Sequence, residues 1–202
     1  MATGSSGNAS VISGKNENIA VDFGLSYKKW STLLDKYGLK EPTHLFITHS
    51  HSDHSNISGL SRLMHVDNDI KIHTNRGDFE TDDFIVNCFL VPHNVENHGL
   101  LATEKSTGKR LVYVTDCSSM YKTLLSHEDK LQGADIFALE ANYDEKYLTH
   151  PEYLDARNYR YNVFSNMMRH TSKQEALKTY AKLKGKHSKF VPLHMSSRFY
   201  NL

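Results

Sequence analysis

The chain has 202 residues and a net charge of +1, and 39% of its residues are hydrophobic, which fits a globular protein with a full core. It contains no run of about 18 apolar residues, so we expect no membrane span, and its two cysteines give no disulfide framework. Residues 1–7 lack a basic region followed by an apolar one, so we expect no secretory signal and a location in the cytoplasm. The length of the chain predicts a single domain, residues 1–202.

Short apolar strands alternate with amphipathic segments along the chain. Gly14 lies in one tight turn and Gly108 in another, and strand-like segments flank each turn, so we predict two β-hairpins. The predicted strands cover residues 10–13, 19–23, 45–47, 70–73, 85–91, 100–104, 110–115, 136–139 and 189–193. The predicted helices cover residues 26–36, 55–64, 120–126 and 172–184, with an acidic loop at 78–83 and an irregular helical segment at 143–161.

The order of these elements predicts the fold class. Hairpins mixed with single helices favour two mixed sheets packed face to face, with helices on both outer faces. We therefore predict an α+β fold arranged as a four-layer αββα sandwich. Capping residues support the helix starts: Ser26, Ser55 and Ser172 are candidate N-caps, and Glu175 completes a capping box after Ser172.

The most informative segment is residues 48–54, Thr-His-Ser-His-Ser-Asp-His, between a predicted strand and a predicted helix. Neutral imidazole and carboxylate are ligands that suit zinc and similar divalent ions. His49 and His51 are two residues apart, so their side chains point to the same side of an extended backbone. Asp53 and His54 follow where the chain turns, and they can face a second ion close to the first. A polar loop rich in histidine is the alternative, but the ordered H-x-H-x-D-H spacing argues against it.

Residues of metal-ligand type also follow several predicted strands. They are Asp22, His49, His93, Asp116 and His194. Strand ends along one edge of a sandwich are where a functional site gathers its side chains. We therefore expect these residues to meet at one edge of the fold.

This order resembles that of the metallo-β-lactamase-fold hydrolases, in which a strand-end Asp precedes H-x-H-x-D-H, and a His, an Asp and a final His follow. The resemblance implies two divalent metal ions with a shared aspartate. In this arrangement the first ion is held by His49, His51 and His93, and the second by Asp53, His54 and His194, with Asp116 bridging both. We expect zinc at both positions, with manganese as the alternative.

Three further residues near this set allow more than one role. Asp22 either orients a ligand or simply ends a strand. Cys117 is either a thiolate ligand or a small buried residue. His98 is a reserve ligand because it follows His93 closely.

Other stretches narrow the resemblance. Residues 3–8, 47–49, 91–93, 114–116 and 139–144 are together similar to the YycJ (WalJ)-type branch, which is linked to nucleic-acid exonuclease activity. Residues 169–172 and 193–200 resemble the C-terminal motifs of ribonuclease Z. The chain has no room for a β-CASP-type insertion or a ribonuclease Z exosite arm, which argues against a tRNA or a long duplex as the substrate.

The resemblance implies phosphodiester hydrolysis by a hydroxide shared between two metal ions about 3.5–4 Å apart. We expect Asp53 and Asp116 to orient the nucleophile. His170 is the candidate proton donor to the leaving oxygen, and a polar residue ahead of a helix cap is its alternative role. Hydroxyl groups and one guanidinium beside the ligands are expected to contact phosphate oxygens: Ser196, Ser197, Arg198, Ser5 and Ser6.

Charge is distributed unevenly along the chain. Residues 1–155 contain 14 Lys and Arg against 22 Asp and Glu, whereas residues 156–202 contain 10 against 1. The basic segment also contains Tyr159, Tyr161 and Phe164. This composition attracts polyanions, and a solvated helix face is the alternative interpretation.

Four functions are compatible with these features. The first hypothesis is a nuclease of exonuclease type on DNA or RNA. The second is a cyclic nucleotide phosphodiesterase, in which the basic segment would form a homodimer surface or a pocket rim. The third is a lactonase or thioesterase, against which the Ser-Ser-Arg sequence after His194 counts. The fourth is a metal-stabilised binding protein without turnover.

Overall fold

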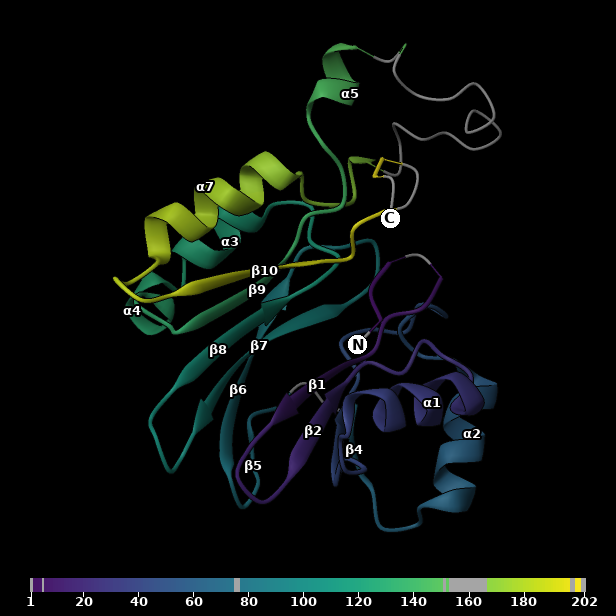
Figure 1. Ribbon diagram of the computed structural model, residues 1–202. Coiled ribbons are helices and arrows are strands. Elements are labelled where there is room, and N and C mark those ends of the chain that lie inside the picture. Colours follow the sequence, from purple (N-terminus) through teal and green to yellow (C-terminus); the bar gives the residue numbers. More distant parts are fainter. Residues whose placement is uncertain are drawn as a thin grey trace.

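The computed structural model describes residues 2–4, 6–74, 77–150, 152, 167–196 and 199–200. Its strands form two sheets that pack face to face (Figure 1). The first sheet has the order β1-β2-β3-β4, from β1 (Ser10–Ser13), β2 (Asn18–Val21), β3 (His44–Phe46) and β4 (Lys71–His73). The second has the order β10-β9-β8-β7-β6-β5, from β5 (Phe79–Glu80), β6 (Phe84–Val91), β7 (Asn97–Glu104), β8 (Arg110–Val114), β9 (Ile136–Glu140) and β10 (Lys189–Leu193).

Helices cover the outer face of each sheet (Figure 1). The helices on the first sheet are α1 (Tyr27–Tyr37) and α2 (Ile57–Val66), and those on the second are α3 (Met120–Leu125), α4 (Glu128–Leu131) and α7 (Lys173–Leu183). One core cluster, which includes Phe46 and Leu100, lies between the sheets. A second, around Trp30, joins α1 and α2 to their sheet, and a third, around Phe137, joins the second sheet to its helices. The predicted α+β fold and its αββα layering are confirmed.

Strand direction explains why the predicted ligands can meet. The strands β2, β3 and β4 are parallel, and so are β8, β9 and β10. Strand β6 runs in the same direction as β8, because both are antiparallel to β7. The C-terminal ends of these parallel strands therefore lie at one edge of each sheet, which is where polar side chains from successive strands are brought together.

Most predicted elements are present, and local capping chemistry accounts for several of their ends. The Ser26 hydroxyl accepts a hydrogen bond from Lys29 N, and the Ser172 hydroxyl accepts one from Glu175 N at 2.9 Å. Both predicted caps are confirmed. The predicted cap of α2 is wrong by one residue, because the Asn56 side chain, rather than Ser55, accepts from Gly59 N.

Three other predictions need correction. The predicted acidic loop contains β5, which pairs with β6. Within the described part of residues 143–161, the helix is limited to α5 (Lys146–Thr149), and the remainder of that prediction lies outside the described residues. Helix α4 was not predicted, because its four residues are too short to show a helical period.

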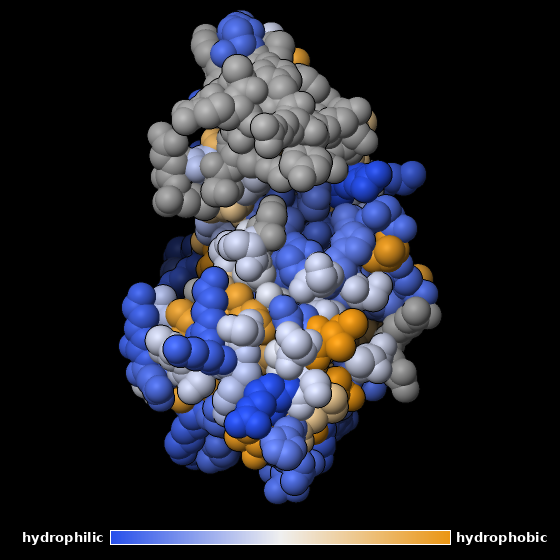
Figure 2. Space-filling model, turned by 90° about the vertical axis from the view of Figure 1, so that its right-hand side faces the viewer, coloured by the Kyte–Doolittle hydropathy of each residue, from blue (hydrophilic) through white to orange (hydrophobic). Residues whose placement is uncertain are grey.

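The surface over α1 and α2 carries isolated hydrophobic side chains. Ile57 is 82% exposed, and Met64 and Val66 are about half exposed. Figure 2 shows this side of the molecule, where hydrophobic atoms form small areas separated by hydrophilic ones. Single exposed apolar residues are normal on protein surfaces. Among the helices of the described residues, none is long and apolar enough to cross a membrane.

Gly24 follows β2 at a point where three segments of backbone meet. Its N–H donates to the Asn8 carbonyl at 2.8 Å, and Asn8 N donates to the Asp53 carbonyl at 2.7 Å. A Cβ atom at Gly24 would overlap the Asp53 carbonyl oxygen. Glycine is therefore needed here to hold the H-x-H-x-D-H loop against the end of β2.

We predict that Gly24→Ala lowers the free energy of unfolding by about 3 kcal/mol, because a backbone oxygen must move to make room. The matched control is Gly108→Ala, where a Cβ meets nothing within 4 Å and only the positive φ of 69° opposes the change. That control should lose about 1 kcal/mol. Urea unfolding of both variants checks the prediction, and equal losses would contradict it.

Candidate metal centre

The H-x-H-x-D-H segment connects the end of β3 to the start of α2. Backbone hydrogen bonds hold it from two sides: Phe23 N donates to the His54 carbonyl at 2.7 Å, and Asn8 N donates to that of Asp53. The loop is thus attached both to the end of β2 and to the N-terminal loop. This places its side chains at the edge where the strands of the two sheets end.

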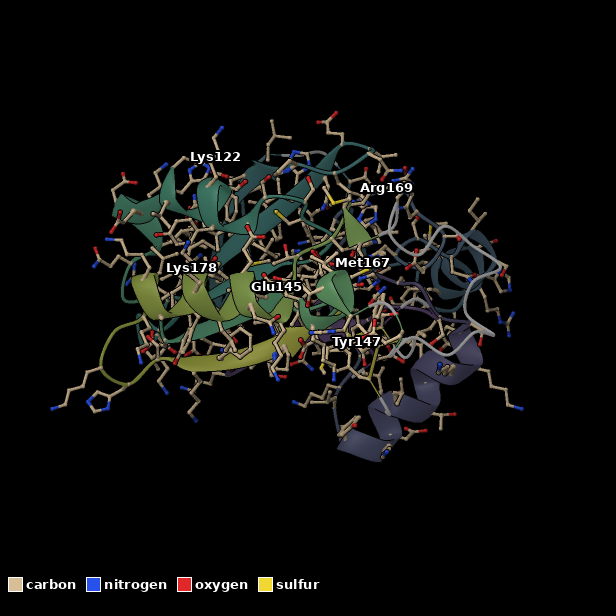
Figure 3. All side chains as sticks on the ribbon, turned by 90° about the horizontal axis from the view of Figure 1, so that it is seen from above. Lys122, Glu145, Tyr147, Met167, Arg169 and Lys178 are labelled. Carbon is tan, nitrogen blue, oxygen red and sulfur yellow. The ribbon has the colours of Figure 1, made fainter. Side chains whose placement is uncertain are left out.

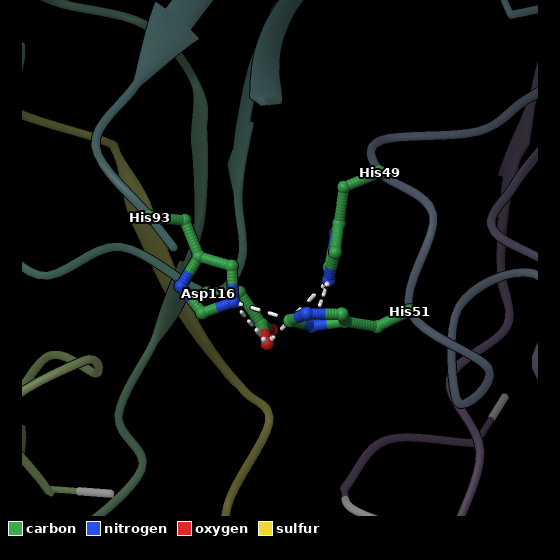
Figure 4. Close-up of side chains that lie close together, drawn as sticks. All are labelled: His49, His51, His93 and Asp116. Carbon is green, nitrogen blue, oxygen red and sulfur yellow. Dashed lines mark hydrogen bonds and ion pairs between the residues drawn. The ribbon is translucent and has the colours of Figure 1, made fainter. Parts of the chain in front are cut away.

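Four candidate ligands form one compact group at this edge, namely His49, His51, His93 and Asp116. Figure 4 shows two of the three histidines of the H-x-H-x-D-H loop, His49 and His51, facing His93 and Asp116. Nε2 of His49 lies 3.1 Å from Nδ1 of His51 and 3.8 Å from Oδ2 of Asp116. Nε2 of His93 lies 3.7 Å from the same Asp116 oxygen. Nδ1 of His93 lies 3.3 Å from the Arg169 carbonyl, to which it can donate, and this leaves Nε2 for a ligand.

Further groups of ligand type adjoin the first. One consists of Asp53, His54 and His194, and another of Asp116, Glu140, His170 and His194. Nε2 of His194 lies 3.5 Å from Oδ2 of Asp53, and Nε2 of His54 lies 3.6 Å from the same oxygen. The structure therefore brings all seven predicted metal ligands together, and it adds Glu140 and His170 beside them.

Asp116 lies between these groups. Its Oδ2 faces His49 and His93 at 3.8 and 3.7 Å. Its Oδ1 faces His54 Nε2 at 3.2 Å and His194 Nδ1 at 3.4 Å. One oxygen is thus directed to each histidine group, which is the arrangement that a carboxylate shared by two ions requires.

Three residues that build this edge share an unusual backbone conformation. Asp22, Asp116 and His194 each follow a strand and have φ values of 64°, 52° and 49°. This left-handed region is costly for residues other than glycine, and it persists where the surrounding structure imposes it. Around Asp116 the Asn97 side chain imposes it by donating to the carbonyls of Thr115 and Asp116, each at 2.9 Å.

Asp22 occupies the position of an orienting residue. It is fully buried, and its Oδ2 lies 2.7 Å from Nδ1 of His54. Its Oδ1 accepts from the backbone N–H and the hydroxyl of Thr48, both at 2.8 Å. Because Nδ1 of His54 is engaged in this way, Nε2 is the nitrogen that faces Asp53 and Asp116.

A sequence profile of the metallo-β-lactamase superfamily matches residues 2–117, more than half of the chain. The chain belongs to this superfamily. The matched residues contain the H-x-H-x-D-H segment, His93 and Asp116, whereas His170 and His194 lie beyond them. The superfamily fold and the His/Asp groups of this chain together imply bound divalent metal ions, and the identity of the metal and the narrower YycJ-type assignment remain predictions.

Several solved structures are similar to the whole chain. The short form of human tRNase Z has 19% identity and a TM-score of 0.65, covering 97% of this chain and 91% of that one. YhfI from Bacillus subtilis has 13% identity and a TM-score of 0.62, with 95% and 79% covered. A diphosphatase of the PhnP family has 17% identity and a TM-score of 0.60, with 94% and 73% covered. At these identities the likeness extends to the fold. The comparison with curated proteins gave no match.

The surroundings of His194 fit a bound metal ion. Nε2 of His194 is buried and makes no hydrogen bond among the described residues, although Oδ2 of Asp53 lies 3.5 Å away. Nδ1 of the same ring is already close to the Asn142 amide and to Glu140 Oε1, at 3.0 and 3.2 Å. A buried imidazole nitrogen without a partner is unfavourable unless a ligand occupies it, so the donor set fits a bound cation.

Sequence reasoning gave Glu140 no role in the site: it lies just after the predicted strand 136–139, within the stretch 139–144 that resembles the YycJ-type branch. Glu140 is fully buried, and its Oε1 lies 2.6 Å from Nδ1 of His170. Its Oε2 accepts from Cys117 N at 2.8 Å and from Thr171 N at 3.0 Å. A charged residue directly after an apolar strand was the one available signal. Asn8, whose amide lies 2.9 Å from Nε2 of His54, was also missed because an asparagine in a loop carries no periodic pattern.

The surroundings lower the pKa of His49 and raise the pKa values of His54 and His194. Burial lowers the pKa of His49 to about 3, with help from the nearby His54, so this ring is neutral. Burial also opposes charge on His54, but the Asp22 and Asp116 carboxylates outweigh it and raise the pKa well above its usual value. His194 follows the same logic beside Asp116, and its pKa is raised to about 10.

Of the five residues predicted to contact phosphate, the structure describes two, Ser6 and Ser196. Ser196 is buried just after His194, and Ser6 is exposed in the N-terminal loop, which packs against that segment through Gly4 and Met195. Ser5, Ser197 and Arg198 lie outside the described residues.

The two reserve candidates lie outside the groups of ligand type. Cys117 is fully buried, and burial raises the pKa of its thiol to about 12, which agrees with a small buried residue. His98 is buried, and it does not belong to any metal-type group of the described residues.

We predict that the affinity for zinc rises with pH. Metal ligation needs unprotonated imidazole, whereas the carboxylates around His54 and His194 keep these rings protonated at neutral pH. Below the raised pKa values, the ion at the position of His54 and His194 must displace protons, so the affinity of that position should increase between about pH 6 and pH 9. Competition with a chelator across this range, with calorimetry in buffers of different ionisation enthalpy to count protons, checks it. Affinity independent of pH would contradict the assignment of these rings as ligands.

Proposed function

We propose that this chain is a phosphodiesterase that uses two divalent metal ions, and that it acts as a nuclease of exonuclease type on single-stranded DNA or RNA. The observation that carries the proposal is the position of Asp116. Its two oxygens face separate histidine groups, and the Glu140–His170 pair adjoins the same carboxylate, with Nδ1 of His170 at 3.9 Å from Oδ2. Such an arrangement serves hydrolysis better than simple metal storage, because it adds a proton donor to two ion positions.

The residues that would hold the ions are those predicted from the sequence. His49, His51 and His93 would hold the first ion, Asp53, His54 and His194 the second, and Asp116 both. The ions, zinc or manganese, would supply a water that is deprotonated near neutral pH and positive charge for the phosphate oxygens. Asp53 and Asp116, as hydrogen-bond acceptors beside the ion positions, would orient the nucleophile.

His170 is suited to protonate the leaving group. Glu140 lies 2.6 Å from its Nδ1, and this carboxylate outweighs the effect of burial and raises the pKa of His170. The raised pKa favours the protonated ring, in which Nε2 is left to donate. Its side chain is 17% exposed, whereas that of Glu140 is fully buried, so His170 can meet a substrate. When the phosphorus–oxygen bond breaks, the leaving alkoxide would take this proton.

The charge of the C-terminal segment and the names of two structures with the same fold support a nucleic acid as the substrate. Residues 156–202 hold 10 basic residues against 1 acidic residue, which favours a polyanion. Two structures with the same fold are named as a tRNase and a diphosphatase, and both names denote phosphate chemistry.

We predict that the zinc- or manganese-loaded protein shortens an end-labelled single-stranded oligonucleotide step by step. Asp116→Ala should abolish this cleavage, because it removes the carboxylate shared by both ion positions. Denaturing gels read the products, and the position of the label gives the direction. Cyclic mononucleotides are assayed in parallel. Cleavage of these alone would move the function to nucleotide hydrolysis, and full activity of the variant would refute the shared role of Asp116.

We predict that His170→Ala slows oligonucleotide cleavage by about 10²- to 10⁴-fold. The same change should affect bis(p-nitrophenyl) phosphate much less, because p-nitrophenolate leaves without a proton. Glu140→Gln should act in the same direction, since it removes the charge that raises the pKa of His170. The nitrophenyl substrate also reports whether each variant retains a working site. Equal losses on both substrates would assign His170 a structural role instead of a catalytic one.

A further inference from the structure

A groove runs along the outer flank of the candidate metal centre, where the turn between β6 and β7 meets α3. It consists of two adjoining depressions. The first, of about 750 Å³, is lined by residues 90–97 and by the side of α3. The second, of about 500 Å³, lies over the first turns of α3 and α7. Both are lined by Ser119 and Lys122, so we call the two together the α3 groove.

One end of the α3 groove touches the metal centre. His93 lines the first depression, and its ring belongs to the group around Asp116. Asn97 lines the same depression, and its amide holds the Thr115 and Asp116 carbonyls. The side chain of His93 is only 1% exposed, so a chain in the groove would lie one side chain away from the ion positions.

The first depression has walls of mixed chemistry. Leu90, Pro92 and Val95 provide apolar surface, and Leu90 is 61% exposed. Asn94 supplies an amide, and the α3 side supplies the hydroxyls of Ser119, Thr123 and Ser126. Apolar surface for a base face, with amides and hydroxyls for its edge, is the combination that recognises an unpaired nucleoside.

Two neighbouring helices each present an exposed lysine to the groove. Lys122 and Lys178 are both exposed, and Figure 3 shows them on the neighbouring helices α3 and α7. Lys178 Nζ also lies 4.3 Å from the centre of the Tyr121 ring, so a cation and an aromatic face occur together in the second depression. Single-stranded nucleic acids bind to such combinations of positive charge and aromatic surface.

Carboxylates in the groove are engaged with the protein. Glu175 Oε1 accepts from Tyr121 N at 3.0 Å, and Glu145 Oε1 accepts from the Ser172 hydroxyl at 2.6 Å. Both therefore serve the starts of α3 and α7. Glu96 in the first depression lies 3.8 Å from Nε2 of His98. Lys122 and Lys178 are the exposed cations of the groove, and they stand beside these three carboxylates, of which Glu96 and Glu145 are also exposed.

We propose that the α3 groove binds the single strand that flanks the scissile phosphate. The neighbouring nucleoside occupies the first depression, and the next phosphates meet Lys122 and Lys178. This inference rests on the proposed nuclease function for its biological meaning, whereas the binding itself can be measured without cleavage.

The test uses fluorescence anisotropy of labelled oligothymidylates on metal-free protein, in which no hydrolysis occurs. The octanucleotide should bind more tightly than the dinucleotide. A Lys122→Gln, Lys178→Gln double variant should weaken octanucleotide binding about tenfold and reduce the slope of log affinity against log salt by about 1.4, the value for two lost phosphate contacts. Leu90→Glu should also weaken binding, because it places a negative charge on the wall of the first depression.

The matched control is Lys28→Gln, Lys29→Gln on α1, an exposed pair of lysines on the opposite layer. It should bind as the wild type does. Equal weakening in both double variants, or none in either, would overturn the α3 groove. Hydrolysis of bis(p-nitrophenyl) phosphate by the metal-loaded proteins separates the two proposals. Loss of binding with unchanged hydrolysis supports the groove, whereas groove-dependent binding without any phosphodiester hydrolysis would refute the proposed function and leave the groove in place.

Discussion

The candidate metal centre depends on one carboxylate held in one backbone conformation. Asp116 follows β8 with φ of 52°, and the Asn97 amide donates hydrogen bonds to the carbonyls of Thr115 and Asp116. This geometry sends the two oxygens of a single side chain to different histidine groups. The motif loop supplies His49 and His54 from the other sheet, so the position of Asp116 also determines how the two sheets must meet at this edge.

Around this carboxylate, opposite charges are buried next to one another. Asp22, Asp116 and Glu140 are almost inaccessible, and His54 and His194 face them with raised pKa values. Buried charges are tolerated only when they are paired and hydrogen-bonded. Protons on the histidines fulfil this role in the protein alone, and a divalent cation can replace them. The same pairing that makes the edge stable therefore also prepares it to receive metal.

Much of this could be predicted from the sequence, because strand-end ligands in parallel strands are carried to one edge by the topology itself. His93 and His194 are more than a hundred residues apart, and they were predicted from their positions after apolar strands together with the resemblance to metallo-β-lactamase-fold hydrolases. Glu140 was missed because its partners, His170 and His194, are defined by tertiary packing and leave no spacing pattern. The β5 strand was missed for a similar reason, since an edge strand of two residues forms only through its neighbour β6.

The choice of helix caps shows the limit of local rules. Ser26 and Ser172 were predicted correctly, because each is the capping residue nearest to its helix. Before α2, Ser55 and Asn56 are both good caps, and the sequence does not show at which residue the helix begins. The structure selects Asn56, whose backbone N–H also donates to the Phe23 carbonyl at the end of β2. A contact distant in sequence thus settles a choice between adjacent residues.

The candidate metal ligands come from both sheets, so metal binding is coupled to the stability of the fold. His49, His51 and His54 follow a strand of the first sheet, whereas His93, Asp116 and His194 follow strands of the second. A cation bound between them cross-links the two halves of the sandwich, and it binds the native chain in preference to the unfolded one. Native stability then increases with the logarithm of free metal concentration, by about 2.7 kcal/mol at a hundred times the dissociation constant. Scarcity of the ion would therefore lower the stability of the fold as well as the activity of the site.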